Sequence, residues 1–153
     1  MTPLLTAIVM WLALNFELPA TDHHPRIEYV PATEITYMRY RAFTPERRRE
    51  VAAALAQSGG KPRQAVAIYD DEKQTIYLDE AWTGRTPADL SVLVHEMVHH
   101  LQGTAQMKYA CPAEREQLAY LAQEKWLSLF GKNLADEFEL DGFTLKISTS
   151  CGF

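Results

Sequence analysis

The sequence predicts an α+β fold in which a small antiparallel sheet packs on helices, with one helix at the centre. Apolar residues recur at helical spacing in residues 87–103, which predicts that central helix. Residues 65–69 and 74–78 are short apolar segments separated by a turn, as in a hairpin. The chain has 153 residues, enough for one domain with a real core and too few for two ordinary domains.

The N-terminal segment is a candidate signal peptide. Residues 4–14 are an apolar run, and no Lys or Arg precedes Arg26. This run is too short to span a bilayer but suits a signal-peptide core, so we expect no stable membrane span. We predict a signal peptide over residues 1–20, cleaved after Ala20, and one domain over residues 21–153. The lack of an early basic residue leaves a buried N-terminal helix and an uncleaved anchor as alternatives.

Further elements follow from local signals. A helix is expected from Pro45 to about Gln57, where a Gly-Gly pair stops it. Ala65–Tyr69 and Gln74–Leu78 are the two predicted strands of the hairpin. Gly142–Ser148 is expected to be a last strand.

The central helix has clear start and stop signals. Thr86 is a suitable N-cap, Pro87 fits the first helical position, and Asp89 lies in the first turn, where carboxylates are favoured. Gly103 is the expected stop. One apolar stripe runs along the helix and should face the core. It comprises Leu90, Leu93, Val94, Met97, Val98 and Leu101.

This helix carries an HExxH motif. His95 and His99 are four residues apart, so both imidazoles project from one side of the helix and can bind one metal ion. Glu96 is offset from both and can hold a water on that ion as a general base. The alternative is a surface helix with two solvated histidines.

A third ligand is expected on the next helix, which we predict from Pro112 to Phe130. Glu116 begins an ExxA pattern, and the small Ala119 would let the two helices approach closely. Glu114 projects in another direction and is the weaker candidate. A first-turn glutamate that stabilises the helix dipole is the alternative for it.

An HExxH motif followed by ExxA on the next helix resembles the gluzincin group of zinc peptidases in its smallest form. The resemblance covers about residues 75–127. It implies a zincin-like domain that binds Zn²⁺ through His95, His99 and Glu116, with Glu96 as general base on a zinc-bound water. It also implies that strand 74–78 pairs with an extended peptide or protein substrate. The metzincin pattern does not fit, because Gln102 and Ala105 occupy its Gly and His positions.

The main functional prediction is therefore a zinc-dependent peptidase. One alternative is a non-catalytic, zinc-stabilised binding domain, although Glu96 would then have no purpose. Another is a cytoplasmic regulatory peptidase that cleaves a transcription factor. A donor to the developing oxyanion is usual in such sites. The candidates for this donor are Tyr109, Tyr120 and His100.

Two cysteines and the net charge bear on the cellular compartment and on the partners that we expect for the protein. Cys111 and Cys151 can form a disulfide in an oxidising compartment, worth roughly 3–4 kcal/mol on the chain-entropy model, or remain two unrelated buried thiols. Together with the candidate signal, they predict a secreted or periplasmic protein. The net charge is -5, and Arg47–Arg49 is the only basic run, so nucleic acid is not an expected partner.

Overall fold

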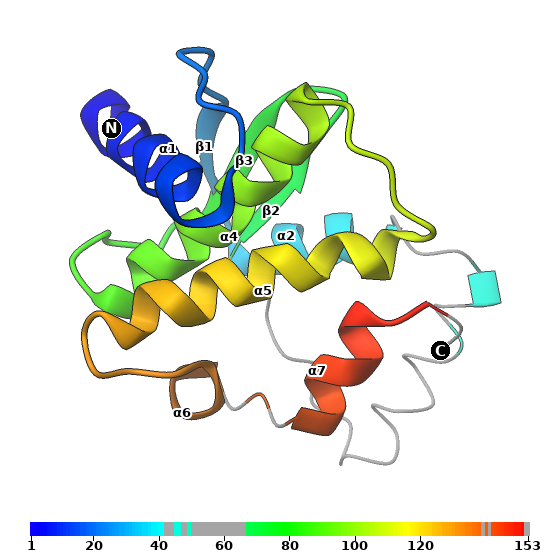
Figure 1. Cartoon of the computed structure of the whole chain (residues 1–153). Coiled ribbons are helices and arrows are strands. Elements are labelled where there is room, and N and C mark those ends of the chain that lie inside the picture. The colour runs from blue at the N-terminus through cyan, green and yellow to red at the C-terminus, as the bar shows by residue number, and fades with distance from the viewer. Residues whose placement is uncertain (42–44, 47–48, 50–66, 139, 141, 152–153) are drawn as a thin grey trace.

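The structure is a computed structural model that describes residues 1–41, 45, 46, 49, 67–138, 140 and 142–151. Helices surround a three-stranded sheet (Figure 1), which confirms the predicted α+β class. The helix predicted from Pro45 to Gln57 lies mostly outside the described residues. The elements are α1 Thr2–Phe16, β1 Arg26–Val30, α2 Ala32–Arg41, β2 Ala67–Asp70, β3 Thr75–Asp79, α4 Pro87–Thr104, α5 Pro112–Ser128, α6 Leu134–Phe138 and α7 Gly142–Thr149.

The sheet has the order β1-β3-β2. β2 and β3 form the predicted antiparallel hairpin, with Ala67 opposite Leu78. β1 runs parallel to β3, with Ile27 opposite Ile76, so the sheet is mixed and not wholly antiparallel. The segment predicted to pair with substrate, 74–78, corresponds to β3. This prediction is wrong, because β3 is paired along both edges and offers no free edge to a peptide.

Helix α4 forms as its sequence signals predict. The Thr86 side chain accepts a hydrogen bond from the Asp89 backbone N–H at 3.0 Å, and Pro87 occupies the first turn. The helix ends at Thr104, within one residue of the expected stop. Every residue from 91 to 102 is buried, because the sheet covers the apolar stripe and α5 packs against the histidine side. Full burial of each large stripe residue from Leu93 to Leu101 stabilises the fold by about 1.5–3 kcal/mol.

Gly103 serves a different purpose from the one expected. It lies within the last turn of α4 and does not end the helix. A Cβ at this position would lie 2.6 Å from Oδ1 of Asp71. That carboxylate forms an ion pair with Arg115 across the end of α4. A larger residue at position 103 would therefore push the Asp71 carboxylate away from its present position beside Arg115.

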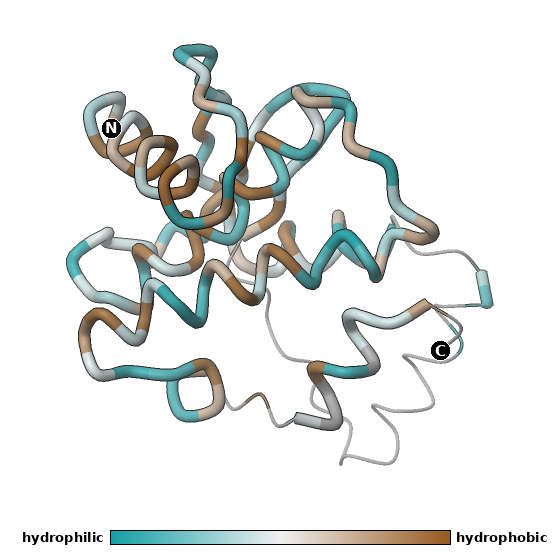
Figure 2. Tube along the Cα trace, in the orientation of Figure 1, coloured by the Kyte–Doolittle hydropathy of each residue, from teal (hydrophilic) through white to brown (hydrophobic). Residues whose placement is uncertain are grey.

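The N-terminal segment forms α1, which packs on the core beside α4. Leu5, Ile8, Val9 and Leu12 are buried. Figure 2 shows hydrophobic colour along much of this helix. This packing is what the alternative of a buried N-terminal helix predicts, and cleavage after Ala20 remains a prediction. Among the described residues, no helix has the length and apolar character needed to cross a membrane.

The C-terminal segment is a helix and not the strand predicted for residues 142–148. Its alternating apolar residues suit a strand, but a strand needs a neighbouring strand to pair with. The tail lies against α5, on the side away from the sheet (Figure 1). Gln117 on α5 donates to the backbone carbonyl of Thr149 at 2.8 Å. The predicted disulfide between Cys111 and Cys151 is present and ties the tail to the start of α5.

Candidate metal centre

Helices α4 and α5 bring two imidazoles and one carboxylate to a single point. Nε2 of His95 lies 2.9 Å from Oε2 of Glu116, and Nε2 of His99 lies 3.1 Å from the same oxygen. Their ligand atoms all lie within 4.8 Å of one another, so the three residues form a group that can hold a metal ion. The two histidine side chains are buried, while that of Glu116 is partly accessible.

Glu114 does not join this group. Its Oε2 accepts a hydrogen bond from the backbone N–H of Ala110 at 2.7 Å, just before α5 begins. This contact ties the preceding loop to the first turn of the helix. Of the two glutamates considered from the sequence, the structure therefore brings only Glu116 to His95 and His99.

Two glutamines orient the imidazoles. Nδ1 of His95 is 2.9 Å from Oε1 of Gln123, and Nδ1 of His99 is 2.9 Å from Oε1 of Gln102. An amide oxygen only accepts hydrogen bonds, so each Nδ1 must carry its proton. In the neutral ring, each Nε2 then has a lone pair available for a metal ion. Without a metal ion, a proton on Nε2 makes the hydrogen bond to Glu116 instead. Both Nε2 atoms point toward Glu116, so the tautomers suit metal binding.

The glutamine amides are themselves held in place. Nε2 of Gln123 donates to Oγ of Ser91 at 3.2 Å, and Nε2 of Gln102 donates to the backbone carbonyl of Arg115 at 3.1 Å. These bonds orient the amide oxygens toward the imidazoles. The sequence analysis did not identify either glutamine as part of the site. The available signal was helical spacing, since Gln102 follows His99 by three residues and Gln123 follows Glu116 by seven.

The charges at the ligand group favour a cation. Burial lowers the pKa of His99, but the negative charge and hydrogen bond of Glu116 outweigh burial, so the pKa is raised. Burial raises the pKa of Glu116, but the charge of His99 and the hydrogen bonds from both imidazoles hold it well below its usual value. The raised pKa of His99 indicates that positive charge is stabilised at this point, and the lowered pKa of Glu116 keeps its carboxylate ionised. A metal ion at this point would satisfy the same three atoms.

Glu96 lies beside the ligands in a small cavity. Its side chain is buried, and among the described residues its carboxylate has no hydrogen-bond partner. The cavity has a volume of about 200 Å³. Its lining comes from α2, β2, α4 and the start of α5, and comprises Arg39, Ile68, Tyr69, Glu96, His99, Pro112, Arg115 and Glu116. The second carboxylate therefore shares a cavity with two of the three candidate ligands.

The three residues considered as oxyanion donors do not line this cavity. Both ring nitrogens of His100 bond to other groups, the Tyr69 hydroxyl and the His23 carbonyl. The ring of Tyr120 packs edge-on against the ring of His95, with centroids 4.6 Å apart. The hydroxyl of Tyr109 donates to the sulfur of Met107 in the loop between α4 and α5. Two arginines, Arg39 and Arg115, line the cavity instead.

Arg115 holds the site together from its edge. Its guanidinium donates to both oxygens of Asp71, to the backbone carbonyl of His99 at 2.8 Å and to Oε1 of Gln102 at 3.2 Å. Burial lowers the pKa of Arg115, but its bond and charge interaction with Asp71 outweigh burial and raise it. Arg115 therefore fixes the ligand-bearing end of α4 to α5 and to the β2–β3 turn.

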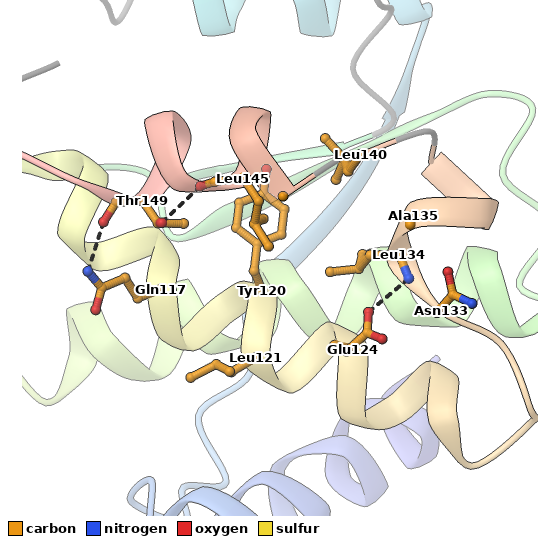
Figure 3. Close-up of a pocket in the computed structure, with 11 residues that line it drawn as sticks. Gln117, Tyr120, Leu121, Glu124, Asn133, Leu134, Ala135, Leu140, Leu145 and Thr149 are labelled. Carbon is orange, nitrogen blue, oxygen red and sulfur yellow. Dashed lines mark hydrogen bonds between the residues drawn. The ribbon is translucent and has the colours of Figure 1, made fainter.

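A second and larger cavity, of about 580 Å³, lies among α5, α6 and α7 (Figure 3). Leucines and Ala135 form much of its wall. Glu124 accepts a hydrogen bond from the backbone N–H of Leu134 at its edge. Tyr120 lines this cavity and also packs on His95, but none of the three candidate ligands lines it. The metal-binding group therefore belongs to the smaller cavity.

Comparison with known proteins assigns a family to the chain. A family model described as a domain of unknown function (DUF6647) matches residues 1–152. No curated protein and no solved structure gives a significant match. The match extends over almost the whole chain, including α1 and the candidate metal centre. The chain therefore belongs to the DUF6647 family.

Proposed function

We propose that this protein is a zinc-dependent peptidase of gluzincin type. One observation carries the proposal. The Nε2 atoms of His95 and His99 converge on the Glu116 carboxylate, and the buried Glu96 carboxylate lies in the same cavity without a described partner. Two imidazoles and one carboxylate, with a separate carboxylate nearby, are the donor set that metal-assisted hydrolysis requires.

The chemistry of the donor atoms supports zinc as the metal. Two neutral imidazoles and one carboxylate are typical of zinc sites in which a fourth position serves the reaction. The glutamine bonds to Nδ1 of His95 and His99 are the outer hydrogen bonds that such ligands generally make. When bound there, zinc supplies a Lewis acid that makes a water molecule reactive near neutral pH.

Glu96 supplies the proton transfers. It accepts a proton from water as the water oxygen bonds to the carbonyl carbon of the peptide, and it gives that proton to the nitrogen as the carbon–nitrogen bond breaks. Its side chain lines the cavity beside the ligands, and no hydrogen bond to another described residue occupies its oxygens. His95, His99 and Glu116 hold the metal, while Gln102 and Gln123 keep the imidazoles oriented.

The disulfide supports a secreted or periplasmic location. Cys111 and Cys151 are bonded, and such bonds persist in oxidising compartments and are rare in the cytosol. This argues against a cytoplasmic regulatory peptidase that cleaves a transcription factor. The proposed substrate is a peptide or an unfolded protein, with a group of the substrate beside the cleaved bond seated in the cavity of about 200 Å³.

The Glu96→Gln variant tests the proposal. It keeps the shape of the side chain but removes the base, so peptide hydrolysis should fall by about 10²–10⁴-fold while zinc content stays at one per chain. Glu114→Gln is the matched control and should retain full activity, because Glu114 lies outside the cavity. The assay would use unfolded protein substrates with zinc-loaded protein. If wild type and Glu96→Gln bind zinc equally and hydrolyse nothing, the protein is a zinc-stabilised binding domain.

A further inference from the structure

The cavity that contains Glu96 has a cationic group on the wall formed by α2. Arg39 of α2 lines the cavity, together with Ile68 and Tyr69 of β2. Its Nη2 donates to the backbone carbonyl of Ala67 at 2.9 Å, which fixes the guanidinium against β2. Its Nε is buried and has no hydrogen-bond partner among the described residues. A guanidinium has five N–H donors, so Arg39 has donors to spare.

The other polar groups on the wall are already engaged. The guanidinium of Arg115 already forms hydrogen bonds with Asp71, Gln102 and the His99 carbonyl. The Tyr69 hydroxyl lies 3.0 Å from Nδ1 of His100 and forms a hydrogen bond with it. Burial, and to a smaller extent the charge of Asp71, raises the pKa of Tyr69 to about 12. Arg39 is therefore the cavity-lining cation with unused donors, within the part of the chain that the structure describes.

A guanidinium with unused donors on a cavity wall can bind an anionic group that completes its hydrogen bonds. Its planar fork matches a carboxylate, which accepts two parallel N–H bonds. The volume of about 200 Å³ can take a carboxylate with a few carbon atoms attached. The lining carries two carboxylates and two guanidiniums, so a divalent cation at His95, His99 and Glu116 would leave the cavity positive and favour an anionic group.

We propose that Arg39 binds a carboxylate of the substrate, so that the protein prefers peptides with a carboxylate group beside the bond that is cleaved. This inference rests on the proposed peptidase function and names its substrate class. The carboxylate comes from the C-terminus of a peptide or from an acidic side chain. Arg39 is a substrate-binding residue in this scheme, and Glu96 remains the base.

Binding of small ligands without turnover tests the proposal. The protein would be the zinc-loaded Glu96→Gln variant, and three probes would be titrated by calorimetry. N-acetylglycine carries a terminal carboxylate, and N-acetylglycinamide is its neutral counterpart. The α-amide of N-acetylaspartate, which keeps a free side-chain carboxylate, represents the acidic side chain. At least one carboxylate probe should bind about 10–100-fold more tightly than the neutral amide, as expected for a charge-assisted bidentate pair. The better of the two carboxylates identifies the source.

Adding Arg39→Gln should abolish this preference, whereas Arg39→Lys should retain part of it because the charge remains. Arg26→Gln is the matched control, since Arg26 is exposed and pairs with Glu28, and it should leave the preference unchanged. Equal binding of carboxylate and amide by the parent protein would overturn the proposal without any Arg39 variant. An undiminished preference in Arg39→Gln with normal zinc content would also overturn it. Absence of peptide hydrolysis by wild type contradicts the peptidase function alone.

Discussion

His99 and His100 are adjacent in the sequence, but their hydrogen bonds prepare them for different tasks. His99 donates Nδ1–H to an amide oxygen and turns Nε2 toward Glu116. In His100, Nδ1 forms a hydrogen bond with the Tyr69 hydroxyl at 3.0 Å, and Nε2 forms one with the His23 carbonyl at 2.8 Å. A carbonyl only accepts, so Nε2 of His100 carries the proton and Nδ1 accepts from the tyrosine O–H.

The comparison teaches that the partner of each nitrogen, and not the residue type, decides which histidine can bind metal. Both nitrogens of His100 are occupied by protein groups on the sheet side of α4, so no lone pair is left. Burial lowers the pKa of His100 and keeps the ring neutral, although its bond to the His23 carbonyl acts in the opposite direction. His100 therefore anchors α4 to β2 and to the segment before β1.

Removing each histidine in turn tests most directly which of them binds zinc. His99→Ala should weaken zinc binding by more than the roughly 10–100-fold that loss of a supporting hydrogen bond costs, because a ligand itself is lost. His95→Ala should have a similar effect, whereas His100→Ala should leave zinc affinity close to that of wild type. Competition with a chromophoric chelator measures all three. Equal losses in the His99 and His100 variants would contradict the assignment.

The two glutamates at the start of α5 provide a second pair of nearby residues of one type, of which only one is expected to bind zinc. Glu116→Ala removes the carboxylate near both Nε2 atoms and should weaken zinc binding about 100-fold or more. Glu114→Ala should leave zinc binding intact and reduce the free energy of unfolding by about 1 kcal/mol, because it loses only the bond to the Ala110 N–H. Zinc titration and urea unfolding of both variants distinguish these outcomes. The reverse pattern would make Glu114 the ligand.

The orienting amides are expected to have a smaller effect. Gln123→Met removes the acceptor for Nδ1 of His95, so the imidazole can adopt the wrong tautomer, and zinc affinity should fall about 10–100-fold. Gln117→Met is the matched control on the same helix, because Gln117 donates to the Thr149 carbonyl and bonds no described residue of the metal-binding group. Its zinc affinity should equal that of wild type. An unchanged affinity in Gln123→Met would show that the amide does not orient the ligand.

His100→Ala should have the smallest effect on the metal but a clear effect on stability. It leaves the Tyr69 hydroxyl and the His23 carbonyl without partners, at a cost of about 2–4 kcal/mol. Because the folded pKa of His100 is lowered, its stabilisation is present above the unfolded pKa, near 6.5, and is lost as pH falls below it. The stability gap between wild type and His100→Ala, measured on metal-free protein by urea unfolding, should narrow below about pH 6.5. A gap that widens in acid would contradict this.

Local signals explain why the ligand helices could be predicted. The Thr86, Pro87 and Asp89 start signal and the four-residue histidine spacing belong to one helix, so their geometry follows from its pitch. Glu116 could be preferred because Ala119 lies one turn further along the same helix. The bonds that orient the ligands could not be predicted in the same way. Gln123 is 28 residues from His95, and only the packing of α5 on α4 brings them together.

The elements that the sequence analysis missed depend on distant contacts. β1 is a strand because it pairs in parallel with β3, which is distant in the sequence. Arg39 of α2 is held at the cavity by a hydrogen bond to the carbonyl of Ala67, 28 residues away. The α7 segment has the alternation of a strand, but it packs on α5 and is tied by the disulfide at Cys151. Tertiary contacts decide these cases, because the local pattern of apolar residues fits more than one structure.

X-ray absorption at the zinc edge, on purified protein reconstituted with zinc, tests the central claim most directly. The account predicts one zinc per chain with two imidazole nitrogens from His95 and His99 and oxygen donors that include Glu116. The spectrum of His100→Ala should be identical to that of wild type. A third imidazole that disappears in His100→Ala, or the absence of stoichiometric zinc, would contradict the account.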